Sequence, residues 1–293
     1  MTVRTFDASS SNRSAFVHAA TIWRFPGLVW HNRFMVQNFL RRDLLSRVNG
    51  SVLGVGWILL QPLFLFAVYY LVFGLFLGPK TGEGPDLNFA IYLFSGVIVF
   101  HALTEATTQS CVAIVDNGNL VKKVAFPSEA LLVHTAAVSI VIYLVGALVC
   151  LLAGALLGVA QPGWLLLAWP LVLLVQFALT LGIGLLLANL YVFLRDVAQL
   201  WRIVSMAWMF LSPVFWQTTT IEPKMPPALL PWFINLNPAY PLLQVHRLVL
   251  GGPEAVLGPF WPQLGVAAAW ASGFLLVGYS VFMSRKHRYA DLV

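Results

Sequence analysis

Long and mostly apolar runs, separated by short polar stretches, dominate the chain, and most of them are long enough to cross a membrane as a helix. About 20 helical residues, at about 1.5 Å per residue, span the hydrocarbon core of a bilayer. The pattern predicts six spans, near residues 54–77, 89–112, 131–159, 165–194, 200–216 and 261–283. Glycine, proline and charged residues lie between the runs and indicate loops.

Two further segments are apolar but interrupted. Residues 28–47 mix aromatic side chains with arginines, which predicts an amphipathic helix lying flat on the cytoplasmic face of the membrane. Residues 228–250 contain three prolines and several polar side chains. Because a lipid-exposed span would leave its broken backbone unpaired, we expect this segment to be re-entrant from the extracytoplasmic side and packed against protein.

Composition agrees with an all-α membrane protein. Of the 293 residues, 59% are hydrophobic and 10% are charged, whereas about a quarter of the residues of a soluble domain are charged. Six spans leave no room for a sizeable soluble domain. We therefore expect a cytoplasmic N-terminal segment with the interface helix (1–50), a six-span transmembrane domain (51–284) and a cytoplasmic tail (285–293).

Positive charge predicts the orientation of the spans. With six spans, 14 of the 17 lysines and arginines fall on one side, and Lys80, Lys224 and Arg247 lie opposite. Basic residues are enriched in cytoplasmic loops, so both termini are expected in the cytoplasm. If residues 228–250 formed a seventh span, the basic cluster at 285–288 would lie outside, which argues against that count.

The polar crossover between the second and third spans is the most distinctive loop. Residues 116–119 favour a turn or helix cap, residues 120–126 form a short run that carries Lys122 and Lys123, and Pro127 ends it. We expect a short helix on the membrane surface that serves as a cytoplasmic docking surface. The alternative is a solvated loop without a partner.

The motifs of several enzyme classes are missing from the sequence. It contains no G-x-x-x-x-G-K-[ST] loop, the P-loop that binds the phosphates of ATP. A pump that includes this chain would therefore need another chain to hydrolyse ATP. The sequence also lacks H-E-x-x-H, C-x-x-C, G-x-S-x-G and an acidic cluster suited to a metal. We expect no metal or cofactor in this chain and no enzymatic activity. An integral-membrane lipid-modifying enzyme stays a rival hypothesis.

Ionisable residues at membrane depth are candidate functional sites because burying them costs free energy unless they are paired. His101 and Glu105 stand four residues apart on the second span, so they share one helix face. Their role is either packing between helices or gating. Arg195 and Asp196, which end the fourth span, are also gating candidates.

Aromatic residues are abundant on the first and fifth spans. Sugars present apolar faces that stack on rings, so these side chains could line a path for a glycan. The alternative is that they form ordinary interface belts and core. The candidate lining residues are Tyr69, Tyr70 and Phe73 on the first span and Trp208, Phe215 and Trp216 on the fifth.

Short motifs occur in order along nearly the whole chain. They are residues 42–57 with Gln61-Pro62, then Glu105, then Asn117, Asn119-Leu120, Lys122-Lys123-Val124 and Phe126-Pro127, then Arg195-Asp196-Val197, Ser212-Pro213-Val214, Leu236-Asn237-Pro238 and Tyr289-Ala290-Asp291-Leu292. As an ordered set they resemble the permease subunits of ABC-2-type exporters of polysaccharides and polyol phosphates.

The resemblance implies a homodimer of six-span subunits in a bacterial inner membrane, with the pore between the subunits. Two copies of a separate ATP-binding subunit would supply ATP and Mg²⁺, and nucleic acid is not an expected partner. The resemblance places the docking of that subunit on the crossover. The docking residues would be Asn117, Asn119, Leu120, Lys122, Lys123, Phe126 and Pro127.

The substrate that the resemblance implies is a lipid-linked glycan, with O antigen as the first candidate. Teichoic acid, capsule, a drug or a lipid are alternatives. At the inner interface Arg41, Arg42 and Arg47 would recruit the diphosphate head of the lipid through charge-assisted contacts. The alternative is that these arginines only set the orientation of the chain in the membrane and bind anionic membrane lipids.

Overall fold

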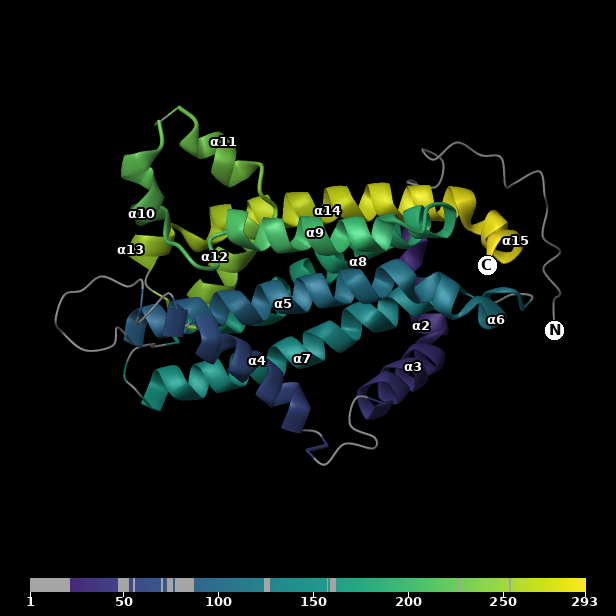
Figure 1. Cartoon of the computed structure of the whole chain (residues 1–293), viewed down its shortest axis with the longest axis horizontal. Coiled ribbons are helices and arrows are strands. Elements are labelled where there is room, and N and C mark those ends of the chain that lie inside the picture. The colour runs from purple at the N-terminus through teal and green to yellow at the C-terminus, as the bar shows by residue number, and fades with distance from the viewer. Residues whose placement is uncertain are drawn as a thin grey trace.

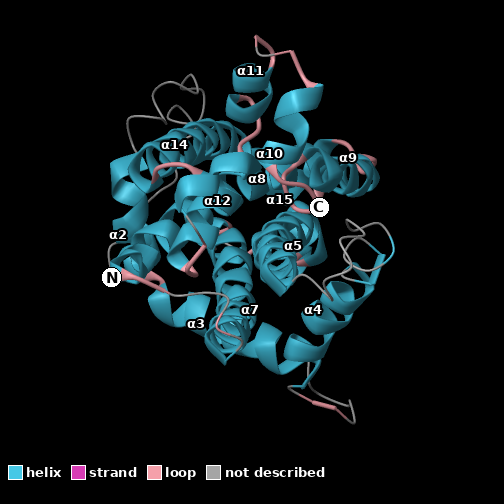
Figure 2. Cartoon of the chain, turned by 90° about the vertical axis from the view of Figure 1, so that its left-hand side faces the viewer, coloured by secondary structure: helices cyan, strands magenta, loops and turns pink. Residues whose placement is uncertain are grey.

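The computed structural model describes most of the chain. The described residues are 22–46, 53–54, 56–69, 71–72, 76, 87–123, 127–156, 158, 162–226, 228–252 and 254–293. Every regular element within them is a helix, as predicted (Figure 2).

Within the described residues, four helices are long and apolar enough to cross a membrane, and they confirm four of the predicted spans. They are α5 (Leu87–Asp116), α7 (Glu129–Leu156), α8 (Trp169–Phe193), which the 3-10 turn η4 (Trp164–Ala168) precedes, and α14 (Phe260–Arg285). The shortest, α8, has 25 residues and is about 38 Å long at 1.5 Å per residue. The chain is therefore a multi-pass membrane protein.

The other two predicted spans correspond to shorter helices. These are α4 (Gly56–Tyr69) and α9 (Val197–Leu211). Helix α9 ends where Ser212 takes up an extended conformation, because a residue before proline is disfavoured in the helical region. The residues that follow α4 are described only in part. The count of six spans therefore stays a prediction.

The predicted interface helix is divided into two helices, α2 (Phe25–His31) and α3 (Arg33–Ser46), after the short turn η2 (Ile22–Arg24). The division lies at Asn32, whose Nδ2 donates to the carbonyl of Leu28 at 2.9 Å. Around it Trp23, Trp30 and Phe34 are exposed. Exposed aromatics beside arginines are typical of a helix at a membrane interface, and α3 packs against α7.

The segment expected to be re-entrant consists of short helices. Within residues 228–250 they are α11 (Leu230–Asn235) and α12 (Ala239–Val249). The short α10 (Thr218–Ile221) and η5 (Glu222–Lys224) precede this segment, and α13 (Glu254–Leu257) follows it. All eleven residues of α12 are buried, which confirms that this part packs against protein. Its depth in the membrane stays a prediction.

The two ends of the molecule carry different elements (Figure 1). The crossover helix α6 (Gly118–Val121) lies at one end together with η6 (Lys286–Arg288) and α15 (Tyr289–Leu292), which continue α14. Helices α10, α11 and α13 lie at the opposite end. The basic crossover and the basic residues after α14 thus share one end, as the charge distribution predicted.

Helices α8 and α14 pack very closely where they cross, at Gly182 and Gly278. A Cβ atom on Gly278 would collide with the carbonyl oxygen of Gly182, and one on Gly182 would lie 2.5 Å from the backbone nitrogen of Leu275. Small residues let helix backbones approach in membranes, where the hydrophobic effect does not drive association. This crossing and the packing of α5 against α7 and α8 form the frame that positions the site described next.

Candidate functional site

A stripe of polar side chains runs along one face of α5. His101, Thr104, Glu105, Thr108 and Gln109 recur at intervals of three and four residues, so they share that face. With Ser205 of α9 they line an open groove of about 230 Å³. We call these six residues the polar stripe. A polar groove on an otherwise apolar bundle is the strongest candidate for a functional site.

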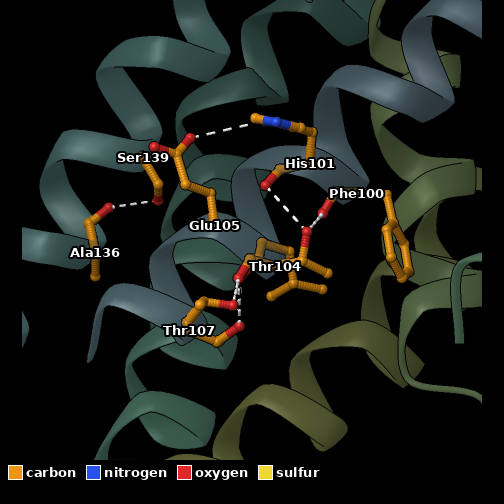
Figure 3. A network of polar contacts seen from close by, with 9 residues as sticks. Phe100, His101, Thr104, Glu105, Thr107, Ala136 and Ser139 are labelled. Carbon is orange, nitrogen blue, oxygen red and sulfur yellow. Dashed lines mark hydrogen bonds and ion pairs between the residues drawn. The ribbon is translucent and has the colours of Figure 1, made fainter. Parts of the chain in front are cut away.

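The predicted contact between His101 and Glu105 is present. Nδ1 of His101 lies 3.7 Å from Oε2 of Glu105, and the two side chains are 24% and 21% exposed (Figure 3). Both therefore border the groove instead of being enclosed between helices. An ion pair that is this long and partly exposed contributes little to stability. Whether the pair acts as a gate stays a prediction.

The threonines of α5 bond to their own helix. Oγ1 of Thr104 donates to the carbonyl of Phe100 at 3.0 Å (Figure 3). Oγ1 of Thr108 donates to the carbonyl of Thr104 at 2.7 Å. Such bonds satisfy the hydroxyl proton inside the helix. The oxygen keeps acceptor capacity, so the groove wall is polar and largely uncharged.

Glu105 also borders a second, much smaller cavity on the other side of the stripe. This cavity of about 10 Å³ is lined by Asp43 of α3, Glu105 and Gln109 of α5, and Thr135 and Ser139 of α7, among others. Glu105 thus lies where the interface helix, α5 and α7 meet. The sequence analysis gave Asp43 no role, because a contact between such distant segments leaves no local pattern.

The candidate aromatic residues of the first span cannot be placed. Tyr70 and Phe73 lie outside the described residues, as does the side chain of Tyr69. On α9, Trp208 packs edge-on against Phe100 of α5 at 5.4 Å between ring centroids. Its indole also donates to Oδ1 of Asn237 at 2.8 Å.

The two other aromatic candidates follow α9. Phe215 is buried, and Trp216 is partly buried with its indole donating to the carbonyl of Phe210 at 3.0 Å. Within one copy of the chain, these rings are engaged by protein and do not line the groove. That they contact a glycan stays a prediction.

Two motifs from the sequence analysis meet beside α9. Nδ2 of Asn237 donates to Oγ of Ser212 at 3.1 Å, and Oδ1 of Asn237 accepts from the backbone of Ala239 at 3.1 Å. Asn237 therefore fixes the break before α12 against the end of α9. This explains why both motifs are polar and contain proline.

The crossover contains a short helix, as predicted, but this helix, α6, begins within the expected cap residues 116–119 and ends before Lys122 and Lys123. Nδ2 of Asn117 donates to the carbonyl of Ala113 at 2.9 Å. Asn119, Lys122 and Lys123 are exposed, and Leu120 and Pro127 are partly buried; Phe126 lies outside the described residues. The two exposed lysines directly after α6 fit a docking surface, and the partner of that surface stays a prediction.

The remaining candidates lie apart from the polar stripe. Arg195 and Asp196 are exposed in the turn between α8 and α9, and the Arg195 guanidinium lies over the Tyr191 ring at 5.2 Å. Arg41 and Arg42 are exposed on α3, and Arg47 lies outside the described residues. None of the four described residues lines the groove.

No group of three or more His, Cys, Asp or Glu residues close enough to hold a metal ion occurs in the part of the chain that the structure describes.

Comparison with known proteins identifies the family. The family model of the ABC-2 type transporter matches residues 36–250 of this chain. The chain belongs to the ABC-2 type transporter family. The match covers most of α3, the crossover, the polar stripe and α12.

Curated relatives of this ABC-2 chain are polysaccharide exporters by name. It is 25% identical over 265 residues to the O-antigen export system permease protein RfbA of Myxococcus xanthus, covering 90% of this chain and 97% of that protein. It is 23% identical over 257 residues to the protein of the same name from Klebsiella pneumoniae, covering 86% and 92%. These matches confirm the resemblance to polysaccharide exporter permeases, and they indicate a transporter subunit instead of an enzyme.

Sequence reasoning missed most of the polar stripe. It singled out His101 and Glu105 as the charged pair and passed over Thr104, Thr108 and Gln109. The signal was present, because these polar residues recur at helical intervals inside an apolar span.

Proposed function

We propose that this chain is the transmembrane subunit of an ATP-driven exporter that moves a lipid-linked polysaccharide, with O antigen as first candidate, outward across the inner membrane. Its family and the names of its curated relatives support the transporter and the glycan. A separate chain hydrolyses ATP.

The observation that carries the proposal is the polar stripe on α5. At the centre of a bilayer a single charged side chain costs about 3 kcal/mol, so a stripe that contains Glu105 is unfavourable if it faces lipid. One copy of the chain leaves the groove open, with His101 and Glu105 partly exposed. The stripe therefore needs either water or further protein in front of it.

A second copy of the chain is the element that we place there. Helix α9, which borders the groove, exposes a run of large apolar side chains that would pack against protein. They are Leu200, Ile203, Val204, Met206, Phe210 and Leu211. In this homodimer α4 and α9 complete six spans per copy, and the two polar stripes face each other across a water-filled pore.

The stripe suits a glycan because a polymer with many hydroxyl groups needs exchangeable hydrogen bonds along its whole path. Threonine and serine oxygens and the Gln109 amide offer such bonds without a strong charge that would hold the chain in place. His101 and Glu105 add the single ionisable pair, at the level where a gate could act.

The cytoplasmic end recruits the substrate and binds the partner that drives transport. Arg41, Arg42 and Arg47 attract the diphosphate of the lipid carrier at the inner interface. Two copies of the ATP-hydrolysing partner, with ATP and Mg²⁺, dock on the crossover that contains Lys122 and Lys123. Both termini lie on this side.

Depletion of the chain in its own host tests the proposal. We expect lipid-linked glycan to accumulate at the cytoplasmic leaflet while surface polymer falls, and the accumulated glycan identifies the substrate. Unchanged glycans with altered drug tolerance or lipid asymmetry would refute glycan export and leave an ABC-2 exporter of another substrate.

A further inference from the structure

Residues 286–293 follow α14 and fold back onto the end of the bundle that carries α6 (Figure 1). Tyr289 anchors this segment. Its ring is fully buried, and its hydroxyl lies 3.1 Å from Oδ1 of Asn189 on α8. The ring also packs edge-on against Phe282 of α14 at 5.1 Å between centroids.

An ion pair joins the same segment to the start of α7. Nζ of Lys286 lies 2.8 Å from Oε1 and 2.7 Å from Oε2 of Glu129. Glu129 is only 1% exposed, and it is the first residue of α7 after the crossover. A buried carboxylate is costly without a cation beside it, so this contact fixes α7 to the end of α14.

A third contact reaches α6 itself. Gly118 is the first residue of α6, and a Cβ atom placed on it would lie 2.6 Å from Cγ1 of Val293. Helix α6 has four residues, too few to be stable without tertiary contacts. Its position therefore depends on its neighbours, and the side chain of Val293 is one of them.

We propose that residues 286–293 are a positioning segment, which fixes the positions of the crossover helix α6 and of the start of α7 relative to α14. A displacement of α6 then moves the cytoplasmic ends of α7 and α14 together, instead of bending α6 alone. The inference rests on the proposed function for the assumption that the ATP-hydrolysing partner acts on α6.

The close contact between Gly118 and Val293 permits a sharp test. Gly118→Ala places a methyl group against Val293, whereas Val293→Ala removes the colliding Cγ1 and leaves the remaining Val293 atoms at 3.5 Å or more from it. The double variant should therefore restore the packing. Gly265→Ala on α14 is the matched control, because a Cβ there meets nothing within 4 Å.

The measurement uses the full chain reconstituted with its ATP-hydrolysing partner, and it compares glycan exported with ATP hydrolysed. We expect Gly118→Ala to lower this ratio about fivefold, the lower end of typical coupling between sites. The amount of folded chain and its association with the partner should stay the same. The double variant and the Gly265→Ala control should behave like the wild type.

A second pair of substitutions tests the ion pair without leaving a buried charge. Glu129→Gln combined with Lys286→Met removes the ion pair, and we expect the same fall in the ratio of glycan exported to ATP hydrolysed. Lys286→Arg alone keeps the ion pair and should leave this ratio unchanged.

Three outcomes would overturn the inference. One is an unchanged ratio in both Gly118→Ala and the ion-pair variant. Another is a fall of export and ATP hydrolysis in proportion to lost folded protein, which would make the segment merely structural. If the wild-type complex exports no glycan, the proposed function itself fails and the inference fails with it.

Discussion

The guanidinium carbon of Arg247 lies 3.5 Å from the centre of the Tyr92 ring, and the two side chains join α12 to α5 in the interior of the bundle. Nη2 of Arg247 also donates to the carbonyl of Tyr92 at 3.2 Å. The hydroxyl of Tyr92 donates in turn to the carbonyl of Trp216 at 2.8 Å. Tyr92 thus connects α12 with the loop after α9.

This arrangement predicts that Arg247→Ala destabilises the protein. Arg247 is 3% exposed, so the substitution leaves a cavity and removes a buried cation–π contact, a loss of about 2 kcal/mol or more. Thermal unfolding in detergent measures the effect. Lys224→Ala, at an exposed basic position between α9 and α12, should leave the midpoint unchanged. A midpoint as high in Arg247→Ala as in Lys224→Ala would contradict this role.

The same contact predicts that Gly96 tolerates no larger residue while Arg247 is present. A Cβ on Gly96 would collide with Nη2 of Arg247, so Gly96→Ala should lower the unfolding midpoint. Because the collision needs the guanidinium, adding Gly96→Ala to Arg247→Ala should cost little more than Arg247→Ala alone. Strictly additive shifts in the midpoint would show that the two residues act separately.

The crossing of α8 and α14 gives a third prediction. Gly278→Ala places a methyl group against the carbonyl of Gly182, so the two helices must separate. We expect a loss of about 1–3 kcal/mol, as for other overpacked cores, seen as reduced resistance to heat in detergent. Gly273→Ala on the same helix, where a Cβ meets nothing within 4 Å, is the control. Equal resistance of the two variants to heat would mean that α8 and α14 are less closely packed at Gly278 than the structure shows.

The polar stripe gives a fourth prediction. Thr104→Val with Thr108→Val keeps the shape of the wall but removes the oxygens that face the groove. Export should fall about fivefold, the effect of about 1 kcal/mol from one lost hydrogen bond to the moving chain. The amount of protein in the membrane should not change. Thr180→Val is the control, because Thr180 is buried in α8 and its hydroxyl has no hydrogen-bond partner among the described residues.

The long helices could be predicted from the sequence because each contains a long and mostly apolar run. The predicted span at 89–112 lies inside α5, and the polar cap at Asn117 ends that helix close to where it was expected. The crossover helix and the broken segment before α14 were likewise indicated by local signals, namely asparagine, glycine and proline.

The contacts that organise the site could not be predicted in this way. Arg247 and Tyr92 are 155 residues apart, and Lys286 and Glu129 are 157 residues apart. Nothing in the local sequence of either partner points to the other. The sequence placed Arg247 among the basic residues of the outer side, whereas the structure buries it on α12 against α5.

The central claim is that the polar stripe lines the path of the glycan, and site-directed photo-crosslinking during export tests it most directly. A photoreactive amino acid at position 108 should yield adducts of this chain that carry glycan. The same group at Leu190, which is exposed on α8 away from the groove, should yield lipid adducts without glycan. Glycan adducts from position 190 but not from position 108, in cells that export normally, would contradict the account.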